Sequence, residues 1–205
     1  MEEKYMEKQL IIAVSREYGT GGHRVAKALA EKFGINFYDR RMLEEIADQK
    51  NMSVDTLHKY DELPRNVFIS RTVRGMSNSP EEAVANFQFD YIREKADSGE
   101  SFVILGRCAE HVLKDHPALI TVFILGDKED KLKYVEERRR VNAQQAAAMM
   151  YRHDKKRKAY HNYYCPNKWG DARGYDVTLN ISKLGVEKAA DFLESYVRMR
   201  IELNK

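Results

Sequence analysis

The sequence has few cysteines and no long hydrophobic run, and each absence excludes a class of protein. Its 205 residues include only two cysteines, Cys108 and Cys165, without the pattern of a disulfide-rich secreted domain. No stretch approaches the roughly 20 apolar residues that span a bilayer. Residues 1–9 are charged and lack the apolar segment of a signal peptide. We therefore expect a cytoplasmic protein with no membrane partner.

An excess of charge of one sign is also missing. The formal net charge is only +3, from 35 basic and 32 acidic residues, which gives no support for a nucleic-acid partner. Basic residues are nevertheless dense over residues 138–157, and this cluster predicts either an anionic ligand or a solvated face. Arg138, Arg139 and Arg140 are adjacent, so at most two of them can face a ligand, and we favour a solvated face. The length and the 43% hydrophobic content suit a single domain over residues 1–205.

The most informative stretch is a strand, turn and helix over residues 10–34. A short β-branched run over residues 10–14 predicts a strand that is buried on both faces. Apolar spacings of three and four over residues 25–33 predict a helix that ends at Gly34. Three of the four residues 19–22 are glycine. Such a turn leaves backbone N–H groups at the positive end of a helix dipole, which favours phosphate binding over a plain packing turn.

The turn matches the P-loop pattern G-x-x-x-x-G-K-[ST] only in part. Gly21 occupies the second glycine position, whereas Arg16, Gly22 and His23 stand at the other three defining positions. The lysine that usually contacts the phosphates is therefore absent, and another cation must replace it.

The dinucleotide pattern G-x-G-x-x-G also matches in part. Gly19 and Gly21 fit, but Arg24 stands at the third glycine position. Asp39 follows at the distance expected of a ribose-binding carboxylate. These three matching residues keep a dinucleotide-dependent oxidoreductase as an alternative.

Strands and helices alternate along the rest of the chain. Further strands are predicted over residues 35–38, 102–105, 119–125 and 176–181, and helices over 41–49, 79–98, 127–141, 144–163 and 186–203. This alternation indicates βαβ units and a parallel sheet. Ligands of such sheets bind beyond the carboxyl ends of the strands. Polar and cationic residues follow several of the strands, so we expect an anionic ligand there.

Taken together, these motifs resemble the cytidylate kinase-like family of P-loop kinases. The resemblance rests on residues 11–22, 37–43, 103–107, 136–140, 153–157 and 175–181, in the order of the family. It implies a three-layer α/β/α P-loop kinase fold with a five-stranded parallel sheet. It also implies a mobile acceptor-binding insertion over about 51–98 and a helical lid over about 142–170. The implied activity is transfer of the γ-phosphate of ATP, with Mg²⁺, to a nucleoside monophosphate such as CMP.

The chain departs from the family pattern at positions that bind phosphate. Gly22 replaces the P-loop lysine. Of the lid pattern R-x-x-x-D-x-x-R, Asp154 and Arg157 match, but Met150 stands at the first arginine. Two alternatives therefore stay open: a catalytically weak nucleotide-binding regulatory protein, and a kinase of a non-nucleotide small molecule. The substrate is a small molecule in either kinase interpretation, and the amphipathic C-terminal helix is compatible with a monomer or a homodimer.

The donor side of the site follows from the chemistry of phosphoryl transfer, which needs positioning and positive charge. Arg16 is expected to replace the lysine, with a salt bridge to Glu17 as the alternative. Arg157 is expected to stabilise charge on the transferring phosphate, with Asp154 holding its guanidinium. The predicted ATP- and phosphate-binding residues are Gly19, Thr20, Gly21, Gly22, His23 and Arg24, and the predicted catalytic residues are Arg16, Arg152, Asp154 and Arg157.

The acceptor side is predicted around Asp39, Arg41, Arg71 and Arg107. Arg107 follows a strand end, which suits it to binding an acceptor phosphate. Asp39 is expected to bind or polarise an acceptor hydroxyl or to orient an arginine, and a role as a helix cap near Arg41 is equally open.

No metal-ion site is predicted in the protein itself. Cys108, His111 and His116 are spaced somewhat like ligands, but no CxxC pair accompanies them and Cys165 is distant in sequence. The P-loop hydroxyl that usually helps to hold Mg²⁺ is absent, and Thr20 or Ser15 is the candidate to assist the ion through its hydroxyl or a water.

Overall fold

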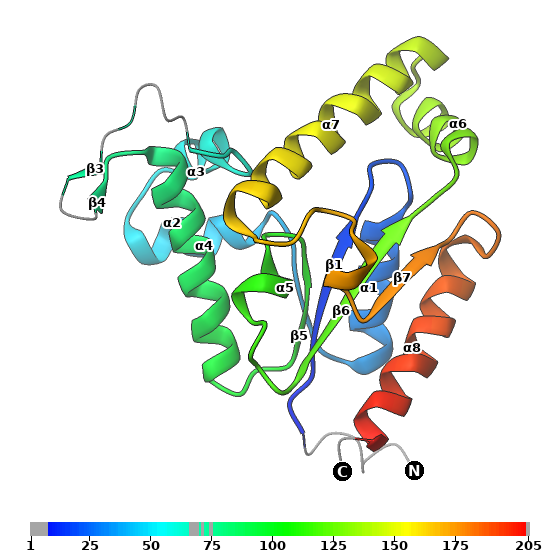
Figure 1. Ribbon diagram of the computed structural model, residues 1–205, viewed down its shortest axis with the longest axis horizontal. Coiled ribbons are helices and arrows are strands. Elements are labelled where there is room, and N and C mark those ends of the chain that lie inside the picture. Colours follow the sequence, from blue (N-terminus) through cyan, green and yellow to red (C-terminus); the bar gives the residue numbers. More distant parts are fainter. Residues whose placement is uncertain (1–7, 66–69, 71, 74–75, 204–205) are drawn as a thin grey trace.

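The computed structural model describes residues 8–65, 70, 72–73 and 76–203. At its centre is a parallel sheet in the order β2-β5-β1-β6-β7 (Figure 1). Its strands are β1 (Ile11–Arg16), β2 (Asn36–Tyr38), β5 (Phe102–Leu105), β6 (Leu119–Leu125) and β7 (Val177–Asn180). The five-stranded parallel sheet expected from the sequence is therefore confirmed.

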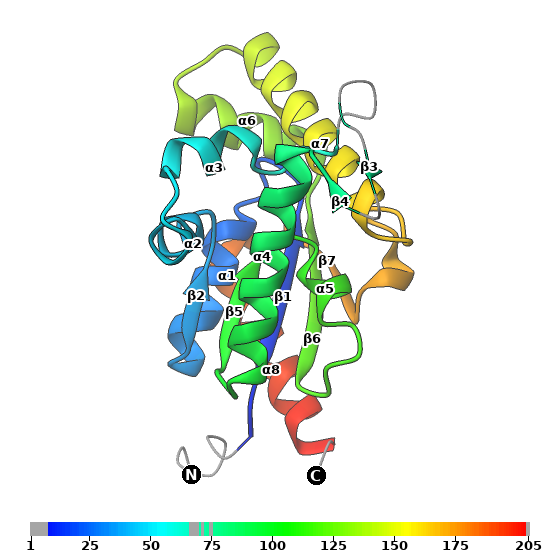
Figure 2. The ribbon, with the colours of Figure 1, turned by 90° about the vertical axis from the view of Figure 1, so that its left-hand side faces the viewer.

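Helices cover both faces of the sheet. They are α1 (Gly22–Phe33), α2 (Met42–Lys50), α3 (Val54–Tyr60), α4 (Pro80–Asp97), α5 (Ala109–Val112), α6 (Lys128–Arg139), α7 (Ala143–Tyr164) and α8 (Gly185–Leu203). Side chains of β1 alternate between two apolar cores, as the pleat of a strand requires. Ile12 and Val14 pack with α1 and α8, whereas Ile11 and Ala13 pack with α2 to α5. Figure 2 shows the resulting three layers.

Local signals in the sequence explain where two of the long helices begin. Ser79 caps α4 by accepting the N–H of Glu82, with Pro80 at the first helical position, as predicted. Asn142 and Gln145 form a capping box at the start of α7. Both helices therefore start at residues whose side chains satisfy free backbone N–H groups.

The structure extends and refines the predicted elements. β1 continues through Ser15 and Arg16, which pair with β6, so the glycine-rich turn is shorter than expected. The short α5, the 3₁₀ turn Ala172–Gly174 and the pair β3 (Thr72–Val73) and β4 (Met76–Ser77) were not predicted, because elements this short carry no periodic pattern. None of the described helices is long and apolar enough to cross a membrane.

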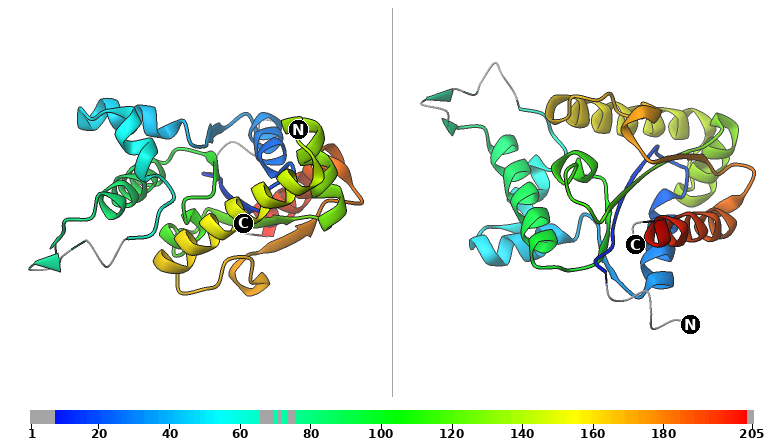
Figure 3. Two further views of the ribbon diagram at one scale, coloured as in Figure 1. Left: turned by 90° about the horizontal axis from the view of Figure 1, so that it is seen from above. Right: turned by 60° about the horizontal axis from the view of Figure 1, so that its bottom comes forward.

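The two predicted mobile regions differ in how they join the sheet. α4 lies within the predicted insertion over about 51–98. It places Val84 and Ile92 in the apolar core that also contains Ile11 and Ala13 of β1. The predicted lid over about 142–170 contains the long helix α7, which packs on α6 through Val135, Ala146 and Met150. Figures 1 and 3 show α7 passing above the carboxyl ends of the central strands, over the turn between β1 and α1.

Candidate active site

The turn between β1 and α1 presents unpaired backbone N–H groups at the start of a helix. Gly19 and Gly21 adopt positive φ angles of 87° and 80°, a conformation that glycine adopts readily. The hydroxyl of Thr20 accepts the N–H of Gly22 at 3.1 Å and thereby closes the turn. Within the described part of the chain, the N–H groups of Gly19, Gly21 and His23 donate to no protein acceptor. They are free to donate to an anion.

Arg16 occupies the space that a side chain at position 22 would need. A Cβ added to Gly22 would lie 2.7 Å from the Cβ of Arg16, closer than such atoms approach. A lysine at position 22 and Arg16 in this conformation therefore exclude one another. The guanidinium of Arg16 extends to the end of β5, where its Nη1 would lie 2.7 Å from a Cβ added to Gly106.

The charge of Arg16 is not neutralised by an ion pair among the described residues. The alternative salt bridge with Glu17 does not form, because Glu17 lies 2.6 Å from the Nζ of Lys131. Burial and the positive charge of Arg157 lower the pKa of Arg16 to about 9. Both effects disfavour the cation, so an anion bound here would relieve an unfavourable interaction.

Helix α7 brings Arg157 and Asp154 to the same turn. The Nη1 of Arg157 donates to the carbonyl of Arg16 at 3.3 Å, and the guanidinium lies 5.8 Å from the centre of the Tyr18 ring. Asp154 accepts the N–H of Tyr18 at 2.7 Å, and its nearest approach to the Arg157 guanidinium is longer, at 3.7 Å. Asp154 therefore fixes the turn to α7 and also lies beside the charge of Arg157.

A pocket of about 250 Å³ opens beside this turn. Its wall includes Arg138 and Arg139, which are also exposed, so the prediction of a purely solvated face is incomplete. The ring of Tyr18 stacks on His153, with ring centres 4.2 Å apart. The pocket is lined by Arg16, Glu17, Tyr18, Gly19, Gly21, Gly22, His23, Arg24, Tyr134, Val135, Arg138, Arg139 and Arg157.

Arg107 is enclosed rather than open to an acceptor. Its side chain is 3% exposed, its Nη2 lies 3.0 Å from Oδ2 of Asp61, and its Nη1 donates to Glu62. Asp61 also accepts from Nε2 of Gln88 at 2.9 Å. Burial opposes the charge of Glu62, but Arg107 and then Arg16 outweigh it and lower the pKa of Glu62 to about 2. The guanidinium of Arg107 thus has two carboxylate partners before any ligand binds.

Asp39 links the starts of two helices. Its Oδ1 accepts the backbone N–H of Arg41 at 2.9 Å and the Nε of the same residue at 3.1 Å. Its Oδ2 lies 3.0 Å from Nε2 of His23. Burial raises the pKa of Asp39, but these hydrogen bonds outweigh it and lower the pKa overall. The N-cap of α2 is Arg41, with no side-chain cap, so Asp39 orders the residues just before that helix rather than capping it. Its contact with His23 holds it beside the glycine-rich turn.

The remaining predicted residues differ in whether they reach the pocket. Arg24 lines the pocket, whereas Arg152 is exposed on α7 and lies outside the pocket lining. Arg71 lies outside the described residues. Met150, at the position of the family's first lid arginine, is buried between α6 and α7. The sequence analysis did not select Tyr18, which lines the pocket. Its position next to Gly19 in the glycine-rich turn was the signal that could have found it.

A glycine-rich turn with free amides after the central strand of a parallel sheet, under a helix that carries arginine, is the arrangement of the P-loop kinase class of fold. The model of the cytidylate kinase-like family matches residues 11–183, and the chain belongs to this family. No curated protein matches the chain.

Solved structures agree with this fold. An uncharacterized protein from Eubacterium ventriosum ATCC 27560 is 41% identical, with a TM-score of 0.74 over 93% of this chain and 99% of that one. The shikimate kinase of Bacteroides thetaiotaomicron is 14% identical, with a TM-score of 0.55 over 92% of this chain and 98% of that one. The shikimate kinase of Acinetobacter baumannii, solved with shikimate, is 17% identical, with a TM-score of 0.51 over 100% and 99% of the two chains. The two kinases share the fold with this chain.

Proposed function

We propose that the protein is a kinase that transfers the γ-phosphate of ATP to a small molecule. The observation that carries this proposal is a pocket lined by Arg16, Arg157 and the turn with its free amides, in which the guanidinium of Arg16 has no ion pair among the described residues. Two cations and several amide donors at one point match the charge of a polyphosphate. Membership of the cytidylate kinase-like family supports the same conclusion.

In this proposal Arg16 does the work of the absent P-loop lysine. Its planar guanidinium can bind two phosphate oxygens at once, which a lysine cannot. Arg157 would stabilise the charge that develops on the transferring phosphoryl group as the bond to the bridging oxygen of ADP breaks and the bond to the acceptor oxygen forms. The amides of the turn would hold the phosphates that remain on ADP.

The turn contributes little to binding Mg²⁺ directly. The hydroxyl of Thr20 donates to the carbonyl of Glu17 at 3.0 Å and accepts from Gly22, so it is already used within the turn. Mg²⁺ commonly keeps several waters and binds the phosphates of its nucleotide. We expect it to accompany ATP in that way, with the protein supplying cations around the complex.

CMP is the first acceptor to test, because the family name and the scaffold favour a nucleoside monophosphate. A non-nucleotide acceptor is the second candidate, and a specific observation favours it: Arg107, the residue expected to bind an acceptor phosphate, is already paired with Asp61 and Glu62. An acceptor without a phosphate would not need to displace those carboxylates.

The regulatory alternative predicts binding without transfer. It is motivated by Gly22 and the buried Met150, which occupy positions of two phosphate-binding cations in the family pattern. Tight ATP binding with no acceptor-dependent turnover would favour it over a kinase.

The test is ADP release from ATP and Mg²⁺ with a panel of acceptors. The panel contains CMP and dCMP first, then the other nucleoside monophosphates, shikimate and gluconate. Release that depends on one acceptor supports the kinase and identifies its substrate. If ATP neither stabilises the fold nor is consumed with any acceptor, the proposal is wrong. A parallel titration with NAD tests the oxidoreductase alternative.

A further inference from the structure

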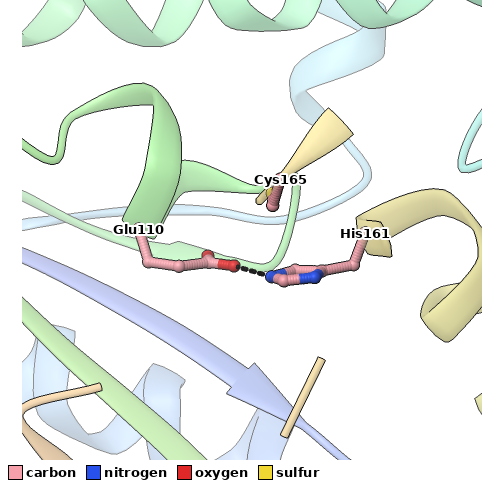
Figure 4. Close-up of side chains that lie close together, drawn as sticks. All are labelled: Glu110, His161 and Cys165. Atoms are coloured by element: carbon pink, nitrogen blue, oxygen red, sulfur yellow. Dashed lines mark ion pairs between the residues drawn. The ribbon is translucent and has the colours of Figure 1, made fainter. Parts of the chain in front are cut away.

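A second cluster of reactive side chains lies at the far end of α7 from Asp154. Glu110 of α5, His161 in the last turn of α7 and Cys165 at its end come together there (Figure 4). One ligand atom from each of the three lies within 4.8 Å of the other two. His161 and Cys165 are one helical turn apart, so both side chains can face the same point. The residues that bind phosphate in the proposed function do not include any of the three.

The three side chains converge on one point inside the fold. The side chains of His161 and Glu110 are 7% and 8% exposed, and Nε2 of the histidine lies 2.7 Å from Oε1 of the glutamate. This close pair is not aligned as a hydrogen bond, so Oε1 of Glu110 is buried without a hydrogen-bond partner. The Nδ1 of His161 is also buried without one. Buried polar atoms without partners are rare and call for an explanation.

The donor set indicates which ion would fit. A thiolate, an imidazole and a carboxylate are ligands of zinc, and hard cations such as Mg²⁺ do not favour sulfur. An ionised Cys165 and Glu110 would supply two negative charges to a divalent cation. Zinc–ligand bonds of about 2 Å place tetrahedral N and O ligands about 3.3 Å apart. The carboxylate and imidazole would need to separate by only about half an ångström from their present contact.

A fourth position is available from solvent. A pocket of about 100 Å³ opens onto Glu110, His161 and Cys165, which is enough volume for a water ligand. The thiol of Cys108 lies within hydrogen-bonding reach of the Cys165 thiol in the same buried cluster, but it is not part of the ligand set that converges within 4.8 Å. Three protein ligands and one water complete a tetrahedral zinc site.

We propose that Glu110, His161 and Cys165 bind one Zn²⁺ ion per chain. The ion would join the end of α7 to α5, which follows β5 and Arg107. Because α7 also carries Asp154 and Arg157, the ion would fix the end of the helix on which the phosphate-binding arginine stands. No sequence pattern indicated this site, because Glu110 is far from His161 along the chain and the nearby His111 and His116 are not in it.

The test is metal binding by the intact protein, freed of any histidine tag and kept reduced. We expect zinc to be found in the protein purified without chelator, at one ion per chain. Co²⁺ added after zinc removal is expected to bind one per chain and to give a sulfur-to-cobalt charge-transfer band. A wild-type protein that binds neither ion would overturn the proposal.

Matched variants locate the ligands. Cys165→Ser and His161→Gln are expected to lose the cobalt band or weaken Co²⁺ binding at least tenfold. Cys108→Ser and His111→Gln, which alter neighbours of the cluster, are expected to bind Co²⁺ as the wild type does. Equal loss in Cys108→Ser and Cys165→Ser would contradict the assigned ligand set. Circular dichroism of each variant shows whether it folds, and retained Co²⁺ binding in folded His161→Gln would also overturn the proposal.

Discussion

The Nη1 atom of Arg16 lies against Gly106, so close that a Cβ on residue 106 would stand 2.7 Å from it. This contact places the guanidinium at the end of β5, beside the phosphate-binding turn. Gly106→Ala is therefore expected to displace the guanidinium and to lower ATP affinity about tenfold, equivalent to about 1.4 kcal/mol. Isothermal titration with ATP measures the loss.

Gly34→Ala is the control for Gly106→Ala. Both glycines have positive φ, 62° and 78°, so alanine strains the backbone at each. No atom lies within 4 Å of a Cβ added to Gly34. We expect both variants to lose about 1–2 kcal/mol of stability, with ATP affinity lowered only in Gly106→Ala. Equal ATP affinities in the two variants would show that the position of Arg16 does not matter for binding.

Arg157→Ala is expected to lower turnover far more than ATP binding. Its guanidinium contacts the carbonyl of Arg16 at the turn, and an arginine that stabilises a transferring phosphoryl group contributes about a thousandfold or more to the rate. Arg152→Ala, on the exposed side of the same helix, is the matched control and should retain its rate. Steady-state kinetics with the identified acceptor distinguish the two, and an unchanged rate in Arg157→Ala would refute the assignment.

Arg107→Met is expected to destabilise the fold. Removing this buried guanidinium leaves the carboxylate of Glu62 without its ion-pair partner and Asp61 with only Arg40 and Gln88, and breaking a buried pair typically costs about 3–5 kcal/mol. Arg173→Ala removes an exposed partner of Asp171 and should cost far less, because solvent screens an exposed pair. Urea unfolding of both variants gives the comparison, and similar losses would mean that the Arg107 pairs are no stronger than a surface pair.

The stability of the protein is expected to fall in acid through Glu62. The pKa of this carboxyl is lowered in the folded state from 4.5 to about 2, so its charge stabilises the fold above the unfolded value and the contribution disappears as the pH falls from 4.5 towards 2. The difference in unfolding free energy between wild type and Glu62→Gln should therefore be constant near neutral pH and shrink in acid. If the difference in unfolding free energy between the two proteins is the same at about pH 3 as at neutral pH, the acid sensitivity does not come from Glu62.

The sequence predicted most of the fold because the long elements carry periodic patterns. The apolar runs that become β1, β5 and β6 and the capped start of α4 are local signals that do not depend on the rest of the chain. The glycine-rich turn between β1 and α1 was predicted for the same reason, since its glycines and the flanking strand and helix are adjacent in sequence.

The contacts that decide the chemistry of the site could not be predicted in this way. Arg107 follows a strand end and was predicted to bind an acceptor phosphate. Its partners Asp61 and Glu62 lie in a distant segment with no recognisable motif. Arg16 in this conformation requires glycine at position 22, and this requirement depends on the distance between two Cβ positions across the turn. Such relationships arise from tertiary packing and leave no period or spacing in the sequence.

The central claim is that Arg16 takes the place of the P-loop lysine. Its most direct test is the affinity of ATP for the wild type and for Arg16→Gln, measured by isothermal titration calorimetry. Gln removes the positive charge and keeps a polar, shorter side chain. We predict that the wild type binds ATP and that Arg16→Gln binds it at least tenfold more weakly, because in the proposed function Arg16 supplies the cation that the absent P-loop lysine would provide. Equal affinity in a folded Arg16→Gln, or no binding of ATP to the wild type, would contradict the account.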